Sequence, residues 1–364
     1  MHSIIRSERA NKSPTKKTFL YITNNLSQAE LALLSIVGSE FDYLVYINNT
    51  QKEYNLLTDY DLPENAKITS DFKSVIMLTT IFSAVITTVG HISPVLNAKI
   101  ISIMKACVAA ELPIIEVPHG LYQWGFNFVD DSKFVNTASH SLGGGYPVPS
   151  FADFQLSWFE EGGVGYPRNR VEKIKRTEVI VVPEYTVITT NTNWYMYNFN
   201  DQRVLAQSIF EYAKAHPDQM FVWCHHSAEL NGMNLINNMY GARPTNIFRY
   251  GHDKDIYFHG IDTTEEVIEH AKSGISTIST CLVDYEIHRI PTAIFANEGL
   301  AKIQQSISPA SFFESPETLR ALDFKIPFTG KLESYDVSRF DLSLKEFLQT
   351  GPSSNTAKRI FMTL

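Results

Sequence analysis

Cysteine is scarce in this chain, and positive charge is not in excess. The 364 residues include three cysteines, Cys107, Cys224 and Cys281, which lie far apart inside apolar stretches. Their odd number and lack of a ligand spacing argue against a disulfide framework or a cysteine-bound metal and indicate reduced thiols in a cytoplasmic protein. The 31 basic and 39 acidic residues give a net charge of −8. We therefore expect no nucleic-acid partner, because general nucleic-acid-binding proteins normally carry a basic excess.

Several widespread motifs and long apolar segments are also absent. No GxGxxG, GxxxxGKS, GxxxxGKT, GxSxG or HExxH motif occurs, which removes the readily recognised dinucleotide-binding, NTPase, esterase and metalloprotease classes. The most apolar long run, residues 74–93, contains four threonines and Gly90, so we do not expect it to span a membrane. Residues 1–17 are polar and basic, without the apolar core of a secretory signal. We expect a flexible leader there, with lysine contact to anionic lipid headgroups as the alternative.

What the sequence does contain is a repeated alternation of strand and helix signals. Short apolar runs predict strands over residues 256–259, 275–279 and 291–296. Helix-start residues at 262–266 and helical apolar spacing over 280–289 predict the helices between them. Strand, helix, strand is the unit of a parallel α/β sheet.

The same alternation extends over the rest of a chain that is long enough for two domains. Further apolar runs predict strands over residues 18–23, 41–47, 85–89, 113–117, 185–189 and 220–224. The polar and basic residues 166–177 form the expected linker between the domains.

Hydroxyl side chains lie where the predicted strand 275–279 runs into a helix. Ligands of open parallel sheets bind beyond the carboxyl ends of the strands. Thr277, Ser279 and Thr280, next to the free N–H groups of a helix start, are suited to hold a phosphate. Glu286 follows one helix later and can accept hydrogen bonds from a ribose. The alternative is that the hydroxyls only cap the helix and that Glu286 is solvated.

Two other predicted strand ends carry polar residues that indicate donor binding. His225 and His226 follow the strand 220–224, and their ring N–H groups can donate hydrogen bonds to a phosphate. No third ligand lies at a telling spacing, so we expect no metal. Thr190 and Asn191 end the strand 185–189, where they either face the ligand or form an ordinary turn.

The candidate catalytic base lies in the first half of the chain. His119 and Gly120 follow the predicted strand 113–117, and the glycine permits close backbone approach. An imidazole has a pKa near working pH and is suited to deprotonate an acceptor hydroxyl. A structural histidine is the alternative. Asp130 and Asp131 are the second candidates for the base, with solvated loop acids as their alternative.

These segments resemble GT-B glycosyltransferases, especially bacterial capsule Kdo transferases and CDP-glycerol glycerophosphotransferases. His119-Gly120 is similar to the "HG" turn of the latter and lies where the former carry "EDG". His225-His226 lies where these enzymes carry "H-P", and Arg289-Ile290-Pro291 is similar to their "G-x-P" turn, with Arg289 in place of glycine.

The resemblance implies an α/β fold with two Rossmann-like domains facing across a cleft. Residues 18–170 would be the acceptor-side domain and 171–340 the nucleotide-donor domain, after the leader 1–17. The last helix, within 341–364, would be able to cross back onto the first domain.

The resemblance also implies an inverting transferase without a metal or other cofactor. It would move a sugar from a CMP- or CDP-type donor to a bacterial surface glycan, as in capsule or lipopolysaccharide synthesis. His119 would be the base, and the strand-end residues of the second domain would hold the donor. The acceptor would be a glycan or glycolipid, which implies a cytoplasmic protein with a peripheral contact to the inner face of the membrane.

Two alternatives stay open. The first is a GT-B enzyme that uses a UDP-sugar, either a transferase or an epimerase, the latter requiring paired acids. The second is a non-enzymatic two-domain sugar-binding protein.

Overall fold

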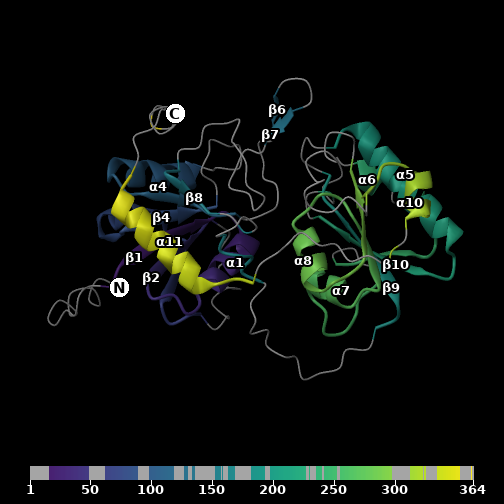
Figure 1. The fold of residues 1–364 in the computed structure, drawn as a ribbon, viewed down its shortest axis with the longest axis horizontal. Coiled ribbons are helices and arrows are strands. Elements are labelled where there is room, and N and C mark those ends of the chain that lie inside the picture. Colours follow the sequence, from purple (N-terminus) through teal and green to yellow (C-terminus); the bar gives the residue numbers. More distant parts are fainter. Residues whose placement is uncertain are drawn as a thin grey trace. The chain divides into compact units, whose positions relative to one another are not determined.

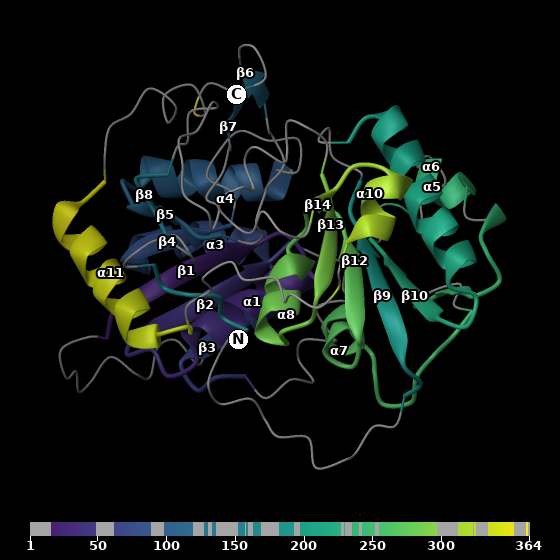
Figure 2. The same cartoon turned by 45° about the vertical axis from the view of Figure 1, so that its right-hand side comes forward.

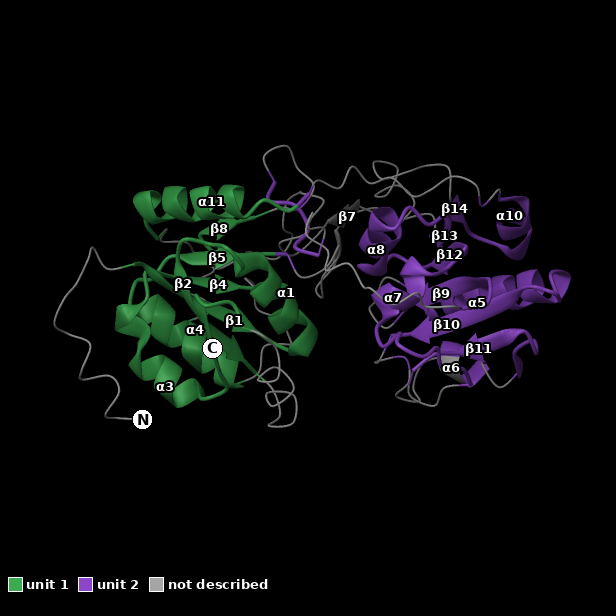
Figure 3. Ribbon diagram, turned by 90° about the horizontal axis from the view of Figure 1, so that it is seen from below, with its two compact units in different colours: residues 1–117, 149–156, 335–364 green, residues 118–148, 157–334 purple. Residues whose placement is uncertain are grey.

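The structure is a computed structural model in which two compact units can be distinguished (Figures 1 and 3). Unit 1 comprises residues 1–117, 149–156 and 335–364, and unit 2 comprises residues 118–148 and 157–334. The functional domains expected from the sequence, with their divide at residues 170 and 171, stay a prediction. The residues that the structure describes are 16–48, 62–88, 98–118, 127–129, 133–135, 152–156, 158, 163–168, 182–192, 197–226, 229, 235–239, 242–251, 255–296, 312–322, 324, 334–352 and 362.

Unit 1 contains a parallel six-stranded sheet in the order β3-β2-β1-β4-β5-β8. Its strands are β1 (Thr18–Thr23), β2 (Asp42–Ile47), β3 (Ala66–Thr69), β4 (Ala84–Thr87), β5 (Ile114–Glu116) and β8 (Phe154–Gln155). Its helical segments are α1 (Leu26–Ile36), α3 (Phe72–Met77), η1 (Thr79–Ile81), α4 (Ala98–Ala109) and α11 (Val337–Thr350).

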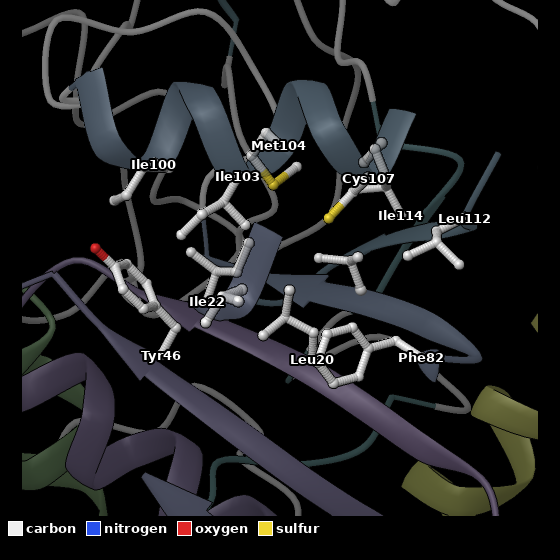
Figure 4. Packing of buried hydrophobic residues seen from close by; sticks show 13 residues of the cluster. Leu20, Ile22, Tyr46, Phe82, Ile100, Ile103, Met104, Cys107, Leu112 and Ile114 are labelled. Carbon is white, nitrogen blue, oxygen red and sulfur yellow. The ribbon is translucent and has the colours of Figure 1, made fainter. Parts of the chain in front are cut away.

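The core of unit 1 forms where helix α4 covers the sheet (Figure 4). Ile100, Ile103, Met104 and Cys107 recur at helical spacing and are buried against sheet residues such as Leu20. Each such side chain contributes about 1.5–3 kcal/mol when fully buried. Burial also raises the pKa of the Cys107 thiol to about 12, so this cysteine is an inert core residue.

Helix α11 packs on unit 1 far from its neighbours in sequence. Asp341 accepts hydrogen bonds from the Ser39 hydroxyl at 2.6 Å and from the Glu40 backbone N–H at 2.9 Å. Phe347 stacks on Phe154 of β8 with ring centroids 4.3 Å apart. A buried polar anchor and an aromatic contact therefore join the C-terminal helix to the N-terminal half of this unit.

Unit 2 repeats the same strand order with its own strands (Figure 2). The parallel sheet β11-β10-β9-β12-β13-β14 is built from β9 (Tyr185–Thr190), β10 (Met220–His225), β11 (Ile247–Arg249), β12 (Ser273–Ser276), β13 (Thr292–Phe295) and β14 (Phe312–Phe313). The helices are α5 (Phe199–Ala215), α6 (Leu235–Met239), α7 (Thr264–Glu269), α8 (Cys281–Ile287) and α10 (Pro316–Ala321), and β6 (Asn127–Val129) pairs antiparallel with β7 (Lys133–Val135).

Both sheets therefore have the 3-2-1-4-5-6 order of Rossmann folds. The predicted α/β class with two Rossmann-like domains is confirmed. In unit 2 the direction of chain winding reverses between β9 and β12, and ligands of such sheets bind at this switch point, beyond the carboxyl ends of the strands.

The prediction of a strand over residues 256–259 is wrong. Residues 256–259 form no strand beyond a single bridge between Tyr250 and Ile256. The Tyr250 hydroxyl accepts a hydrogen bond from the Phe258 backbone N–H at 3.2 Å and donates to the Ile261 carbonyl at 2.6 Å. A side chain thus satisfies backbone groups that a neighbouring strand would otherwise have to bond.

Candidate nucleotide site at the carboxyl edge of unit 2

The candidate site lies where β9, β10 and β12 end together. The parallel register places His225 beside Thr190, and Ser276 beside Thr189. Three predicted donor-binding segments, at the ends of these three strands, are therefore neighbours in space (Figure 3).

A directed chain of buried hydroxyls joins β9 to β12. Ser276 donates to the Thr277 carbonyl at 2.8 Å, so the contact of 2.8 Å between Thr189 and Ser276 uses the Thr189 proton. The Tyr285 hydroxyl, 3.1 Å from Thr189, is then the donor in that pair. Every proton of this relay is committed inside the protein, so these hydroxyls form the floor of the site and do not donate to a ligand.

Gly274 of β12 lies directly beneath the Tyr285 ring. A Cβ atom at this position would lie 2.2 Å from Tyr285 Cε1. The ring is fully buried, and its hydroxyl is held by Thr189, so it cannot move aside easily. A glycine is therefore required here to let α8 pack against the sheet.

A buried carboxylate, Glu229, joins the segments that follow β9 and β10. Its Oε1 accepts hydrogen bonds from the Thr192 backbone N–H at 2.8 Å and from the Thr192 hydroxyl at 2.7 Å. Its Oε2 accepts from the Thr190 hydroxyl at 2.6 Å and from the His226 backbone N–H at 3.3 Å. Burial alone would raise the pKa of Glu229, but the nearby His225 and the hydrogen bonds from Thr190 and Thr192 outweigh it and lower the pKa below its ordinary value.

The two histidines have different surroundings. The His225 ring stacks on the Trp223 indole with centroids 4.7 Å apart, and its Nδ1 lies 3.7 Å from Glu229 Oε2. Burial lowers the pKa of His226, and the nearby Glu229 offsets part of that shift. Burial thus favours the neutral imidazole of His226, a form that carries one ring N–H donor.

Asn191 connects this region to β12 and carries an unsatisfied acceptor. Its backbone N–H donates to Thr277 Oγ1 at 2.8 Å, which ties the end of β9 to the end of β12. Its side-chain Oδ1 is buried and has no hydrogen-bond partner among the described residues. A buried acceptor without a donor costs about 1–3 kcal/mol, so a ligand O–H or N–H placed here would be favoured.

The residues after β12 are less enclosed. Ser279 Oγ accepts a hydrogen bond from the Cys281 backbone N–H at 3.3 Å, and the Thr280 side chain does not cap α8. Glu286 is half-buried near the end of the same helix. The Tyr197 hydroxyl supports this loop, accepting from the Ile278 N–H at 3.0 Å and donating to the Phe295 carbonyl at 3.0 Å.

The sequence-predicted donor residues thus divide into two groups. Thr190 and Thr277 are buried, and their recorded hydrogen bonds run to other protein groups, which makes them supports of the site. Asn191, His226, Ser279, Thr280 and Glu286 are half-buried, whereas the His225 side chain is only 2% exposed and belongs with the buried group. The predicted bases His119, Asp130 and Asp131 lie outside the described residues.

Sequence analysis missed Glu229 and Tyr197. Glu229 could have been found from its position in the sequence, four residues after the strand-end His225. At that separation its carboxylate can reach the end of the strand. In the described part of the chain, no three His, Cys, Asp or Glu side chains are grouped to hold a metal ion. Nor does any described helix have the length and apolar character to cross a bilayer.

Several solved structures share this fold at very low sequence identity. A Listeria monocytogenes protein assigned as a UDP-N-acetylglucosamine 2-epimerase has a TM-score of 0.57 and 11% identity, covering 94% of this chain and 99% of its own. The UDP-GlcNAc 2-epimerase of Methanocaldococcus jannaschii, solved with UDP-GlcNAc and UDP, has a TM-score of 0.54 and 10% identity, covering 93% and 100%. Anabaena HepE, solved with UDP-glucose, has a TM-score of 0.53 and 9% identity, covering 92% and 99%.

No protein-family model and no curated protein sequence matches this chain. The structural likeness, together with the two sheets of Rossmann order, shows a GT-B-type fold.

Proposed function

We propose that this protein is an enzyme that acts on a nucleotide-activated sugar and binds the nucleotide at the carboxyl edge of the unit 2 sheet. A UDP-sugar is favoured over the CMP- or CDP-type donor, because proteins of the same fold have been solved with UDP-GlcNAc and with UDP-glucose. The sequence-based alternative, a UDP-sugar transferase or epimerase, therefore replaces the first expectation as the preferred function.

The observation that carries this proposal is the Oδ1 of Asn191 at the switch point, which is buried and has no hydrogen-bond partner within the described part of the chain. A nucleotide-sugar offers ribose and sugar hydroxyls that can donate to this oxygen. The neutral His226 can donate to a phosphate oxygen, and Ser279 and Thr280 add hydroxyl donors. The internal donors bonded to Glu229 partly offset its negative charge, which limits its repulsion of the phosphates.

The chemical step is assigned from the sequence. In a transferase, His119 is the proposed base that deprotonates an acceptor hydroxyl of a glycan or glycolipid. In an epimerase, the paired acids Asp130 and Asp131 are the proposed groups. A lipid-linked acceptor would bring the protein to the membrane surface, where the basic leader would make a peripheral contact.

Binding is tested by calorimetry and thermal shift with UDP, UDP-GlcNAc, UDP-glucose, CMP and CDP, with and without magnesium. A ligand that binds the native state raises the unfolding midpoint. We expect binding of uridine nucleotides, and weaker binding in Asn191→Ala. Absence of binding by every nucleotide would overturn the proposal, and binding of CMP or CDP alone would restore the first expectation.

The reaction is tested by incubating UDP-GlcNAc with the protein in D2O. Inversion at sugar C2 breaks the C2–H bond, so an epimerase incorporates deuterium into the product, which NMR detects. A transferase instead releases UDP only when an acceptor glycan is added. His119→Ala should abolish transfer, whereas Asp130→Asn and Asp131→Asn should abolish deuterium incorporation.

A further inference from the structure

We propose that Glu229 is a positioning residue whose carboxylate fixes the segments after β9 and β10 in the arrangement that receives the nucleotide. The inference rests on the proposed function, because it concerns the same edge of the sheet. Glu229 is fully buried and its two carboxylate oxygens already accept four hydrogen bonds from protein groups, so it acts through its neighbours rather than by touching the ligand.

The first argument is that one side chain bonds both segments. Thr190 and Thr192, after β9, donate three hydrogen bonds to the two carboxylate oxygens at 2.6–2.8 Å. The His226 backbone N–H, after β10, donates a fourth at 3.3 Å. The His226 N–H also reaches the Thr190 carbonyl at 3.2 Å, so the two segments meet at the carboxylate.

The second argument is that these donors have a fixed direction. The Trp223 indole N–H can only donate, and it donates to Thr190 Oγ1 at 2.9 Å. The Thr190 proton therefore points to Glu229 and cannot be turned away. Two acceptor oxygens are needed at position 229, and an amide supplies only one.

The third argument concerns what the bonded residues carry. Asn191 lies between Thr190 and Thr192, both of which are bonded to Glu229, so its backbone is held from both sides. Its Oδ1 is also the buried acceptor to which none of the described residues donates. His226, held through its backbone N–H, carries the neutral imidazole. Glu229 thus sets the positions of the two groups proposed to face the nucleotide.

Packing alone does not account for this arrangement. A buried carboxylate is costly unless charge-assisted hydrogen bonds surround it, and an apolar residue would fill the space without that cost. A group that needs four donors is useful where those donors must be held in one place.

The test measures the dissociation constants of UDP and UDP-GlcNAc for the full chain by calorimetry. Glu229→Gln keeps the side-chain shape but turns an NH2 group toward two donors. We expect both dissociation constants to rise together by about tenfold or more. The matched control is Asp341→Asn, the same carboxylate-to-amide change at a buried position of unit 1, which should leave them within about twofold.

A double-mutant cycle separates positioning from general destabilisation. If Glu229 acts through Asn191, Asn191→Ala should weaken UDP binding much less in the Glu229→Gln background than in the wild type. Additive effects of the two changes would overturn the positioning role. So would UDP affinity in Glu229→Gln within about twofold of the wild type.

Two other outcomes, a wild type that binds no nucleotide and a variant that does not fold, can be distinguished from a positioning effect. If the wild type binds no nucleotide, the proposed function fails and this inference falls with it. If Glu229→Gln does not fold, as judged by circular dichroism, Thr192→Val removes one of the four donors and keeps the backbone N–H. It should raise the dissociation constant of UDP about threefold, and unchanged affinity would contradict the proposal.

Discussion

The two units have the same strand order but join their central strand ends differently. In unit 1, a neutral amide does this: Gln28 Oε1 accepts hydrogen bonds from the Asn24 backbone N–H and the Thr88 hydroxyl, each at 2.8 Å. In unit 2, the buried carboxylate of Glu229 instead joins the ends of β9 and β10, the counterparts of β1 and β2, and accepts hydrogen bonds from four donors. The switch point of unit 1, between β1 and β4, is therefore bonded by a neutral acceptor, whereas the charged acceptor of unit 2 lies at the neighbouring strand pair, β9 and β10.

This difference indicates where the molecule is specialised. At the ends of β1 and β4, one amide oxygen of unit 1 accepts from two donors. Unit 2 adds the Tyr285–Thr189–Ser276 relay and the Glu229 anchor at one edge. An internally hydrogen-bonded edge that gives Asn191 Oδ1 no donor from the described residues is what a ligand site requires.

The largest expected effect comes from breaking the close packing of unit 2. Gly274→Ala places a methyl group 2.2 Å from the Tyr285 ring, and we expect it to destabilise unit 2 by about 2–3 kcal/mol. Gly38→Ala in unit 1 meets no atom within 4 Å, and its positive φ of 78° should cost only about 1 kcal/mol.

Hydrogen exchange of β12 and β1 amides measures the two units separately. Equal costs for Gly274→Ala and Gly38→Ala would show that the Tyr285 ring can yield.

The next effect concerns the anchor of unit 1. Asp341→Ala removes the acceptor for the Ser39 hydroxyl and the Glu40 N–H, and should destabilise unit 1 by about 2 kcal/mol. Exchange of α11 amides should accelerate, while UDP affinity should not change. A loss of UDP affinity would contradict the assignment of binding to unit 2.

A smaller effect on stability is expected at the switch point of unit 1, where the neutral Gln28 side chain joins the ends of β1 and β4. Gln28→Met keeps the size of the side chain but leaves the Asn24 N–H and the Thr88 hydroxyl without their acceptor, which should cost about 1 kcal/mol. Chemical denaturation gives the stability, and calorimetry with UDP gives the affinity. If this change impaired UDP binding as much as Glu229→Gln, the proposed contrast between the two units would be wrong.

The smallest effect is a pH dependence. Burial lowers the pKa of His226 below its ordinary value of 6.5, so the unfolded chain binds this proton at a higher pH than the folded chain. The free energy of unfolding should therefore fall as the pH drops below 6.5. His226→Gln should reduce the change between about pH 7.5 and about pH 5.5 by up to about 1 kcal/mol. An identical pH dependence in both proteins would place His226 in solvent.

Much of the fold could be predicted because apolar runs mark buried parallel strands. Strands β1, β9 and β10 closely follow the runs in the sequence, and the capping box of Thr263 and Glu266 begins α7 as expected. The strand expected over 256–259 failed because the Tyr250 hydroxyl bonds that backbone, a contact that local sequence does not reveal.

The site was harder to predict than the fold. The strand-end position of Thr190 was clear from the sequence, but the direction of its proton depends on Trp223 and Glu229, 33 and 39 residues away. Glu229 itself follows a polar stretch, where a carboxylate is ordinarily solvated. Burial and hydrogen-bond direction are properties of the folded chain.

Helix α11 has a consequence for synthesis on the ribosome. Asp341 bonds Ser39 across 302 residues, and unit 1 takes its last helix from residues 337–350. Residues 157–334, which supply most of unit 2, leave the ribosome before α11 does. Unit 2 can therefore fold while the surface of unit 1 that α11 covers is still exposed. The first half of this chain would therefore depend longest on protection from aggregation during translation.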